Sequence, residues 1–239
     1  MSKERRNIAI IPARGGSKRI PRKNINDFLG KPIIAYSIEA AIKSELFDEV
    51  MVSTDDEEIA EIARKYGASV PFMRSKFNSN DFATTADVLL EVLEEYKKDG
   101  KEFDYLCCVY PTAPFVTSVK LQDTYDLMIQ KNAEGVIPVV KFSYPIQRAF
   151  RITEENILEF IWPENINKRS QDFETTFHDA GQFYWIKTKS FLLNQILICR
   201  GSIPLIIDEI SVQDIDCEAD FKIAKLKYKL IEGIYNDEL

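Results

Sequence analysis

A chain of 239 residues is somewhat long for one domain and short for two, and its composition is globular, with 45% hydrophobic and 29% charged residues. A formal net charge of −7 argues against general binding to nucleic acid or anionic membranes, because both depend on a broad basic surface. We therefore expect a single domain over residues 1–239 that needs no nucleic-acid or membrane partner.

Neither the N-terminal residues nor the cysteines indicate an exported protein. The first apolar stretch, residues 8–11, ends at a proline and is too short for a signal peptide or a membrane span. The four cysteines lack the spacing of zinc or redox sites, and Cys107 and Cys108 lie together in an apolar run. Reduced core thiols in a cytoplasmic protein are the expectation.

Short apolar runs alternate with amphipathic stretches, which predicts an α/β fold in which helices cover the faces of a sheet. Gly67 is placed to end one helix, and Asn80 or Asp81 is placed to cap the next. The predicted strands are residues 7–12, 49–53, 69–73, 105–110, 135–140, 181–186 and 204–207. The predicted helices are residues 31–44, about 56–66, about 82–98, about 118–131 and about 218–235.

This alternation stops between Lys141 and His178, where polar residues, aromatics and prolines replace the regular periods. We interpret residues from about 141 to 180 as an excursion from the domain.

The first predicted strand leads into the segment IAIIPARGGSKRIPRKN, which carries five cations in ten residues: Arg14, Lys18, Arg19, Arg22 and Lys23. A strand, a glycine-containing loop and a helix place backbone N–H groups at the carboxyl edge of a sheet, where phosphate oxygens bind. The segment has neither the dinucleotide fingerprint nor a complete P-loop. Five cations fit a triphosphate whose pyrophosphate must be neutralised as it leaves. A solvated loop with incidental charges is the alternative.

The segment VQDIDCEADF places Asp214 and Asp216 two residues apart. On an extended chain both carboxylates point the same way and could face one divalent cation. Such a pair alone is weak support, because a polar strand end or a helix cap looks similar. Asp220 is expected at a helix start rather than as a third ligand.

The segment KRSQDFETTFHDAGQFYW places polar side chains between aromatics and includes the only histidine of the chain. This mixture suits a ligand with a carboxylate, hydroxyls and amides, although a structural role for the segment is the alternative. The candidate sugar-binding residues here are Arg169, Gln171, Asp172, His178, Asp179 and Gln182.

The segment IPARGGSKRIPRKN resembles the signature loop of the sugar-acid cytidylyltransferases, the enzymes that make CMP-activated sialic acids and their bacterial relatives. The segments VSTDDEEIAEIARKYGA, NDFATTADV and YPTAPF match the same family, so the resemblance covers nearly the whole chain. It implies a Rossmann-like nucleotide-diphospho-sugar transferase fold with a mostly parallel central sheet, helices on both faces and a dimerisation excursion.

The resemblance also implies roles for individual residues. It places Mg²⁺ on the carboxylates of Asp214 and Asp216, and it implies that Arg14 and Lys23 neutralise the triphosphate. The phosphate contacts that it implies are Arg14, Ser17, Lys18, Lys23 and Asn24, and the candidate contacts to the cytosine end are Arg74, Ala83, Thr84 and Thr85.

The sugar region resembles the pseudaminic acid cytidylyltransferases more than the enzymes for N-acetylneuraminic acid. The latter have a glutamine where this chain has Tyr110, a lysine after the fifth strand where it has Gln147 and Arg148, and an asparagine where it has Ala180. The resemblance implies transfer of CMP from CTP to the anomeric hydroxyl of pseudaminic acid, in a pathway to flagellin or a surface polysaccharide. It further implies a homodimer, in which Gln147, Arg148 and Arg169 could serve the neighbouring subunit.

Three alternatives stay open at this point. The same reaction could act on legionaminic acid, N-acetylneuraminic acid or the eight-carbon acid of lipopolysaccharide cores. A non-catalytic nucleotide-sugar sensor could share the fold, and a dinucleotide-dependent oxidoreductase is disfavoured by the missing glycine fingerprint. The residues do not identify a general base.

Overall fold

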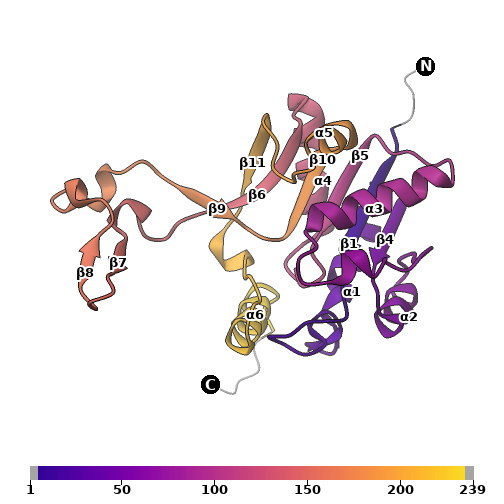
Figure 1. The fold of residues 1–239 in the computed structure, drawn as a ribbon, viewed down its shortest axis with the longest axis horizontal. Helices are drawn as coiled ribbons and strands as arrows, with labels where there is room; N and C mark the ends of the chain where they lie inside the picture. The colour runs from indigo at the N-terminus through magenta and orange to yellow at the C-terminus, as the bar shows by residue number, and fades with distance from the viewer. Residues whose placement is uncertain (1–4, 235–239) are drawn as a thin grey trace.

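The computed structural model describes residues 5–234, in which a central sheet carries helices on both faces (Figure 1). The strand order is β11-β6-β10-β5-β1-β4, with β9 paired to β6. β10 and β9 run antiparallel to their neighbours and the other five strands share one direction, so the predicted mostly parallel α/β sheet is confirmed. The strands are β1 (Asn7–Pro12), β4 (Glu49–Ser53), β5 (Tyr105–Val109), β6 (Gly135–Lys141), β9 (Phe177–Asp179), β10 (Phe183–Lys187) and β11 (Ser202–Ile206).

The prediction of a strand over residues 69–73 was wrong. Ser69 makes a single parallel bridge to Met51, and no strand forms beyond it. Pro71 explains the difference, because proline has no backbone N–H to donate to a ladder.

The described helices are α1 (Ile33–Lys43), α2 (Glu57–Lys65), α3 (Thr85–Lys98), α4 (Ser118–Lys131), α5 (Thr188–Asn194) and α6 (Glu218–Ile231). α5 was not predicted, and α6 ends at Ile231, short of the predicted 235, which lies outside the described residues. α1 begins only at Ile33, because β3 (Lys31–Pro32) pairs with β2 (Asp27–Phe28). Among these helices none is long and apolar enough to cross a bilayer. Short 3-10 helices are η1 (Lys23–Ile25), η2 (Phe77–Ser79), η3 (Ile146–Arg148), η4 (Pro163–Asn165), η5 (Ser170–Asp172) and η6 (Glu209–Ser211).

The core follows from the two-residue period of β1. Ala9 and Ile11 are fully buried in the cluster on the α1, α2 and α4 face, whereas Ile8 and Ile10 are fully buried with α3 and α5 on the other. The adjacent cysteines divide in the same way, Cys107 to the first cluster and Cys108 to the second. A strand that is buried on both faces reads as a continuous apolar run, which is what β1 does.

Between β6 and β9 the chain leaves the body and forms an extended arm, residues 142–176, which projects to the left in Figure 1. Its only described strands are β7 (Phe150–Ile152) and β8 (Leu158–Phe160), three residues each, which pair with each other alone. Large apolar side chains on the arm are exposed: Tyr144, Phe150, Ile152, Ile157, Leu158, Ile161 and Ile166.

Candidate functional site

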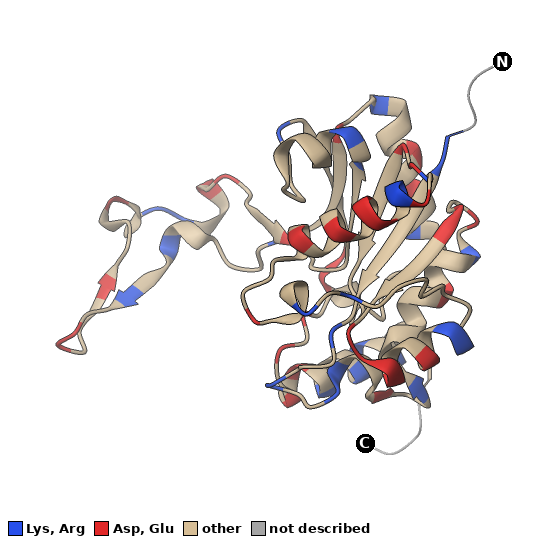
Figure 2. Ribbon diagram, turned by 45° about the vertical axis from the view of Figure 1, so that its right-hand side comes forward, with Lys and Arg blue, Asp and Glu red and all other residues tan. Residues whose placement is uncertain are grey.

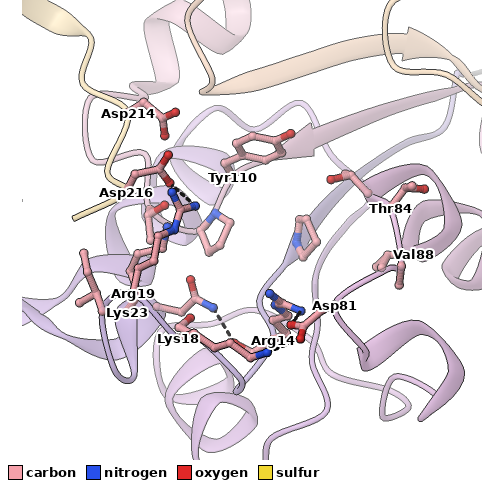
Figure 3. Close-up of a pocket in the computed structure, with 18 of the residues that line it drawn as sticks. Arg14, Lys18, Arg19, Lys23, Asp81, Thr84, Val88, Tyr110, Asp214 and Asp216 are labelled. Atoms are coloured by element: carbon pink, nitrogen blue, oxygen red, sulfur yellow. Dashed lines mark hydrogen bonds and ion pairs between the residues drawn. The ribbon is translucent and has the colours of Figure 1, made fainter. Parts of the chain in front are cut away.

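A cavity of about 450 Å³ opens at the carboxyl ends of β1 and β5. Four segments line it: the loop after β1, the segment before α3, the turn after β5, and the segment before α6 (Figure 3). It therefore lies at the sheet edge where α/β folds bind ligands. All of the predicted nucleotide and metal residues line it: Arg14, Ser17, Lys18, Lys23, Asn24, Arg74, Ala83, Thr84, Thr85, Asp214 and Asp216.

The loop after β1 is held in shape from both sides. The N–H of Gly15 donates to Asp55 Oδ1 at 2.9 Å, and the side-chain amide of Asn24 donates to the carbonyl oxygen of Arg14 at 2.9 Å. A Cβ added at Gly15 would lie 2.6 Å from Asp56 Oδ2. That carboxylate is itself held, because it caps α2 by accepting from the N–H of Ile59 at 3.1 Å. The side chain of Asn24 thus holds the backbone of the loop in place at Arg14.

Of the five cations in this loop, four line the cavity and Arg22 does not. Arg22 has a left-handed backbone, with φ of 55°, and its guanidinium binds Asp56 and Glu58 at the start of α2. These hydrogen bonds raise the pKa of Arg22 and lower that of Asp56. The interpretation that all five cations serve the triphosphate was therefore wrong for Arg22, which fixes the loop to α2 instead.

Lys23 connects the basic loop to the acidic segment. Its Nζ donates to the carbonyl oxygen of Ile215 at 2.7 Å, between the two predicted metal ligands. Burial lowers the pKa of Lys23, and the charges of Asp216 and Asp214 partly offset that effect. The ammonium thus stays close to both carboxylates and to the cavity.

The two carboxylates lie together on the cavity wall, in a segment of irregular structure. Burial, followed by the negative charge of Asp216, raises the pKa of Asp214. Asp216 pairs with Arg19 at 2.7 Å. Asp220 accepts from the N–H groups of Asp216 and Cys217 at 2.9 and 2.8 Å, which agrees with the predicted helix-start role.

Within residues 5–234 no cluster of three or more acidic, cysteine or histidine side chains has a metal-binding arrangement. Two carboxylates are nevertheless a suitable donor set for Mg²⁺, which binds nucleotides through one or two carboxylates and fills its other positions with water and phosphate oxygens. The two carboxylates repel each other, and Asp216 already pairs with the guanidinium of Arg19. Both observations fit a site that binds a cation.

Arg74 and Thr84 also line the cavity, and Thr84 lies across it from Asp214 (Figure 3). Arg74 is 7% exposed, donates Nε to Ser53 Oγ at 3.0 Å, and has its pKa lowered to about 10 by burial. Thr84, rather than Asn80 or Asp81, caps α3, because Thr84 and Asp87 form a reciprocal capping box. Asp81 is thereby free to face the cavity.

The predicted sugar-binding residues divide into three groups. Tyr110 lines the cavity, with its ring centroid 5.4 Å from that of Tyr184. Asp179 and Gln182 do not line the cavity but contact the tyrosine pair. Asp179 accepts from the Tyr184 hydroxyl at 2.6 Å, and the carbonyl oxygen of Gln182 accepts from the N–H of Tyr110 at 2.8 Å. His178 is exposed and packs on Phe142.

The third group lies on the arm, away from the cavity of its own chain. Arg148 donates to Ser170 Oγ at 3.3 Å, Arg169 pairs with Asp172 at 3.1 Å, and Gln147 donates to the carbonyl oxygen of Glu174 at 3.2 Å. The residues that the structure does not bring to the cavity are Gln147, Arg148, Arg169, Gln171, Asp172, His178, Asp179 and Gln182.

Two charged residues of the cavity were not assigned from the sequence. Arg19 was counted in the basic run but given no role, and Asp81 was considered only as a cap. The signal for Arg19 was its place in the basic run of residues 14–23. The partners of Asp81 lie more than 60 residues away in sequence and gave no local signal.

Comparison with known proteins agrees with the family resemblance of the sequence. A model of the cytidylyltransferase family matches residues 8–189. This chain belongs to the cytidylyltransferase family. A pseudaminic acid cytidylyltransferase of Campylobacter jejuni is 44% identical over 94% of this chain and 97% of its own length. A CMP-N,N'-diacetyllegionaminic acid synthase of Legionella pneumophila is 30% identical over 94% of this chain and 96% of its own.

Among solved structures, a CMP:2-keto-3-deoxy-manno-octonic acid synthetase complexed with CTP matches this cytidylyltransferase with a TM-score of 0.68. The identity is 17%, over 95% of this chain and 99% of the other, so the likeness is one of fold. The resemblance to the cytidylyltransferases is confirmed, and so is the expected fold of a mostly parallel sheet with helices on both faces. The dimerisation role of the excursion stays a prediction.

The contact at Gly15 predicts the effect of two neighbouring substitutions. Gly15→Ala places a methyl group against Asp56, so the loop must shift and kcat/KM for CTP should fall about ten- to a hundredfold. Gly16→Ala is the matched control, because a Cβ at Gly16 meets no atom within 4 Å. Pyrophosphate release at varied CTP measures both variants, and equal losses in the two would contradict the role of the close approach at Gly15.

Proposed function

We propose that this nucleotidyltransferase moves CMP from CTP to the anomeric hydroxyl of pseudaminic acid, with release of pyrophosphate. One observation carries the proposal: a basic loop and a pair of carboxylates from opposite ends of the chain line one cavity. The family membership and the 44% identity to a pseudaminic acid cytidylyltransferase support the reaction and its substrate.

In this reaction the anomeric oxygen attacks the α-phosphorus in line, the bond from that phosphorus to the bridging oxygen breaks, and pyrophosphate leaves. The protein contributes alignment and charge stabilisation rather than covalent chemistry. Arg14, Lys18 and Lys23, which line the cavity, would neutralise the triphosphate, and Ser17 and the loop N–H groups would donate hydrogen bonds to its oxygens. Arg74, Ala83, Thr84 and Thr85 line the same cavity and would contact the cytosine end.

Asp214 and Asp216 would hold the Mg²⁺ that we expect this enzyme to use. The ion would supply charge neutralisation at the phosphate oxygens and lower the pKa of a bound hydroxyl. Lys23 keeps the segment between these two aspartates fixed through the carbonyl oxygen of Ile215.

The same chemistry on legionaminic or N-acetylneuraminic acid is the second candidate, supported by 30% identity to the Legionella enzyme. Tyr110 favours pseudaminic acid over N-acetylneuraminic acid. Its ring lies against Tyr184, whose hydroxyl is fixed by Asp179, so the cavity has an aromatic wall where a polar side chain would suit a more hydroxylated sugar.

We also propose that two copies of the chain associate through the arm. A hairpin with strands of three residues is marginal in water unless something covers it, and the arm exposes a row of large apolar side chains. In such a dimer Arg148 and Arg169, which do not line the cavity of their own chain, become available to the cavity of the partner.

The substrate assignment predicts the outcome of a parallel assay. Purified protein with CTP and Mg²⁺ is offered pseudaminic, legionaminic and N-acetylneuraminic acids, and a sample without sugar acid is the control. Pyrophosphate release should be fastest with pseudaminic acid. Preference for another acid would overturn the substrate and keep the reaction, whereas CTP binding without release from any acid would favour a sensor.

The carboxylate pair predicts a metal-dependent loss. The double variant Asp214→Asn, Asp216→Asn should lose at least about a hundredfold in kcat at ordinary Mg²⁺, because charge stabilisation of this kind is worth several orders of magnitude. Asp208→Asn, a nearby acid that does not line the cavity, is the control. Near-normal turnover in the double variant would exclude these residues as the metal site.

The arm predicts a change in assembly. Ile152→Asp places a charge at an arm position that is 69% exposed in the single chain, so the chain should fold but sediment as a monomer. Val119→Asp, at a 59% exposed position on α4, should leave the assembly unchanged. If wild-type protein sediments as a monomer at micromolar concentration, the proposed dimer is wrong.

A further inference from the structure

The cavity contains an acid in the place where the proposed function puts a triphosphate. Asp81 lines the cavity and contacts two cations of the basic loop (Figure 3). Its Oδ1 accepts from Arg14 Nη1 at 3.0 Å, and its Oδ2 accepts from Lys18 Nζ. The same Nη1 of Arg14 donates to the carbonyl oxygen of Asn80 at 3.1 Å.

A carboxylate at this position has opposite effects on the empty and the occupied site. It relieves the repulsion between two neighbouring cations when the site is empty, and the hydrogen bond from Lys18 lowers the pKa of Asp81 so that it stays ionised. When a phosphate chain lies over the same cations, the carboxylate repels it and competes for the same donors.

The contacts of Asp81 are of a kind that a ligand can replace. The side chains of Arg14, Lys18 and Asp81 are 36%, 76% and 45% exposed, and ion pairs this open to water contribute little stability. A triphosphate brings several negative oxygens to the same donors, so it can form more charge-assisted hydrogen bonds with them than a single carboxylate does.

The Arg22 pair is a useful contrast within the same loop. Arg22 forms two hydrogen bonds to Asp56, a side chain that also caps α2, and it does not line the cavity. The Arg22–Asp56 pair therefore attaches the loop to α2, whereas the pairs of Asp81 occupy donors that line the cavity.

We propose that Asp81 is an internal counter-ion of the phosphate site, which holds Arg14 and Lys18 while the site is empty and is displaced when the triphosphate or pyrophosphate binds. This inference rests on the proposed function, since it assumes a phosphate chain in the cavity. It makes Asp81 a positioning residue that lowers the affinity for the phosphate chain and so favours release of pyrophosphate.

Calorimetric titration with pyrophosphate and with CTP, each with Mg²⁺ and without sugar acid, tests the exchange. Asp81→Asn keeps the size of the side chain and removes its charge, so it should bind both ligands about two- to fivefold more tightly than wild type, as expected for losing an exposed ion-pair competitor. The affinity of this variant should also fall more steeply with salt, because its site carries one more net positive charge.

Two further variants separate charge from structure. Asp81→Glu retains the carboxylate and should bind like wild type. Glu57→Gln removes an equally exposed ion pair, with Arg64 on α2, at a position away from the cavity, and should also bind like wild type. Stronger inhibition by pyrophosphate in Asp81→Asn is the kinetic counterpart of the same effect.

The outcomes distinguish the two levels of inference. If wild type binds CTP and turns over but Asp81→Asn binds equally or more weakly, the counter-ion role is wrong and the proposed function stands. If wild type binds neither CTP nor pyrophosphate, the proposed function fails and the exchange fails with it.

Discussion

The parallel pairing of β1 with both β4 and β5 is the constraint on which the site depends. Parallel strands end at the same edge of a sheet, so the loop after β1, the segment that follows β4 and the turn after β5 are forced together. The apolar side chains of β1, buried on both faces, make this arrangement stable. The last wall of the cavity comes from the segment before α6, which Lys23 joins to the loop through the carbonyl oxygen of Ile215.

Charge in this protein is organised locally. Figure 2 shows acidic and basic positions interspersed over the helices and loops, with several acidic positions along α3 and no broad basic face in that view. A chain of net charge −7 can therefore present a cavity lined by more cations than acids only by concentrating its cations there. The cost of that concentration is repulsion between neighbours, and Asp81 and Asp216 offset it for Arg14, Lys18 and Arg19.

The body and the arm divide the two halves of recognition. The body supplies the predicted nucleotide and metal residues, which lie at the ends of buried strands and on the loops that follow them. The arm carries Arg148 and Arg169 on a segment with little buried surface of its own. Arg148 and Arg169 can contact a sugar acid in the cavity only if the arm meets the body of a second copy of the chain. Assembly and sugar recognition are therefore connected in the function that we propose.

The sequence by itself determined the α/β pattern, the basic loop and the acidic pair, because two-residue and 3.6-residue periods and clusters of charge are local properties of a chain. It also carried the family resemblance. Only the tertiary structure decided where individual side chains of irregular segments point. Arg22 leaves the cavity because its left-handed backbone directs it to Asp56, 34 residues away, and Asp81 enters the cavity because Thr84 caps α3 in its place. Side-chain direction in a loop depends on backbone dihedrals and on partners distant in sequence, and neither is recorded in a local pattern.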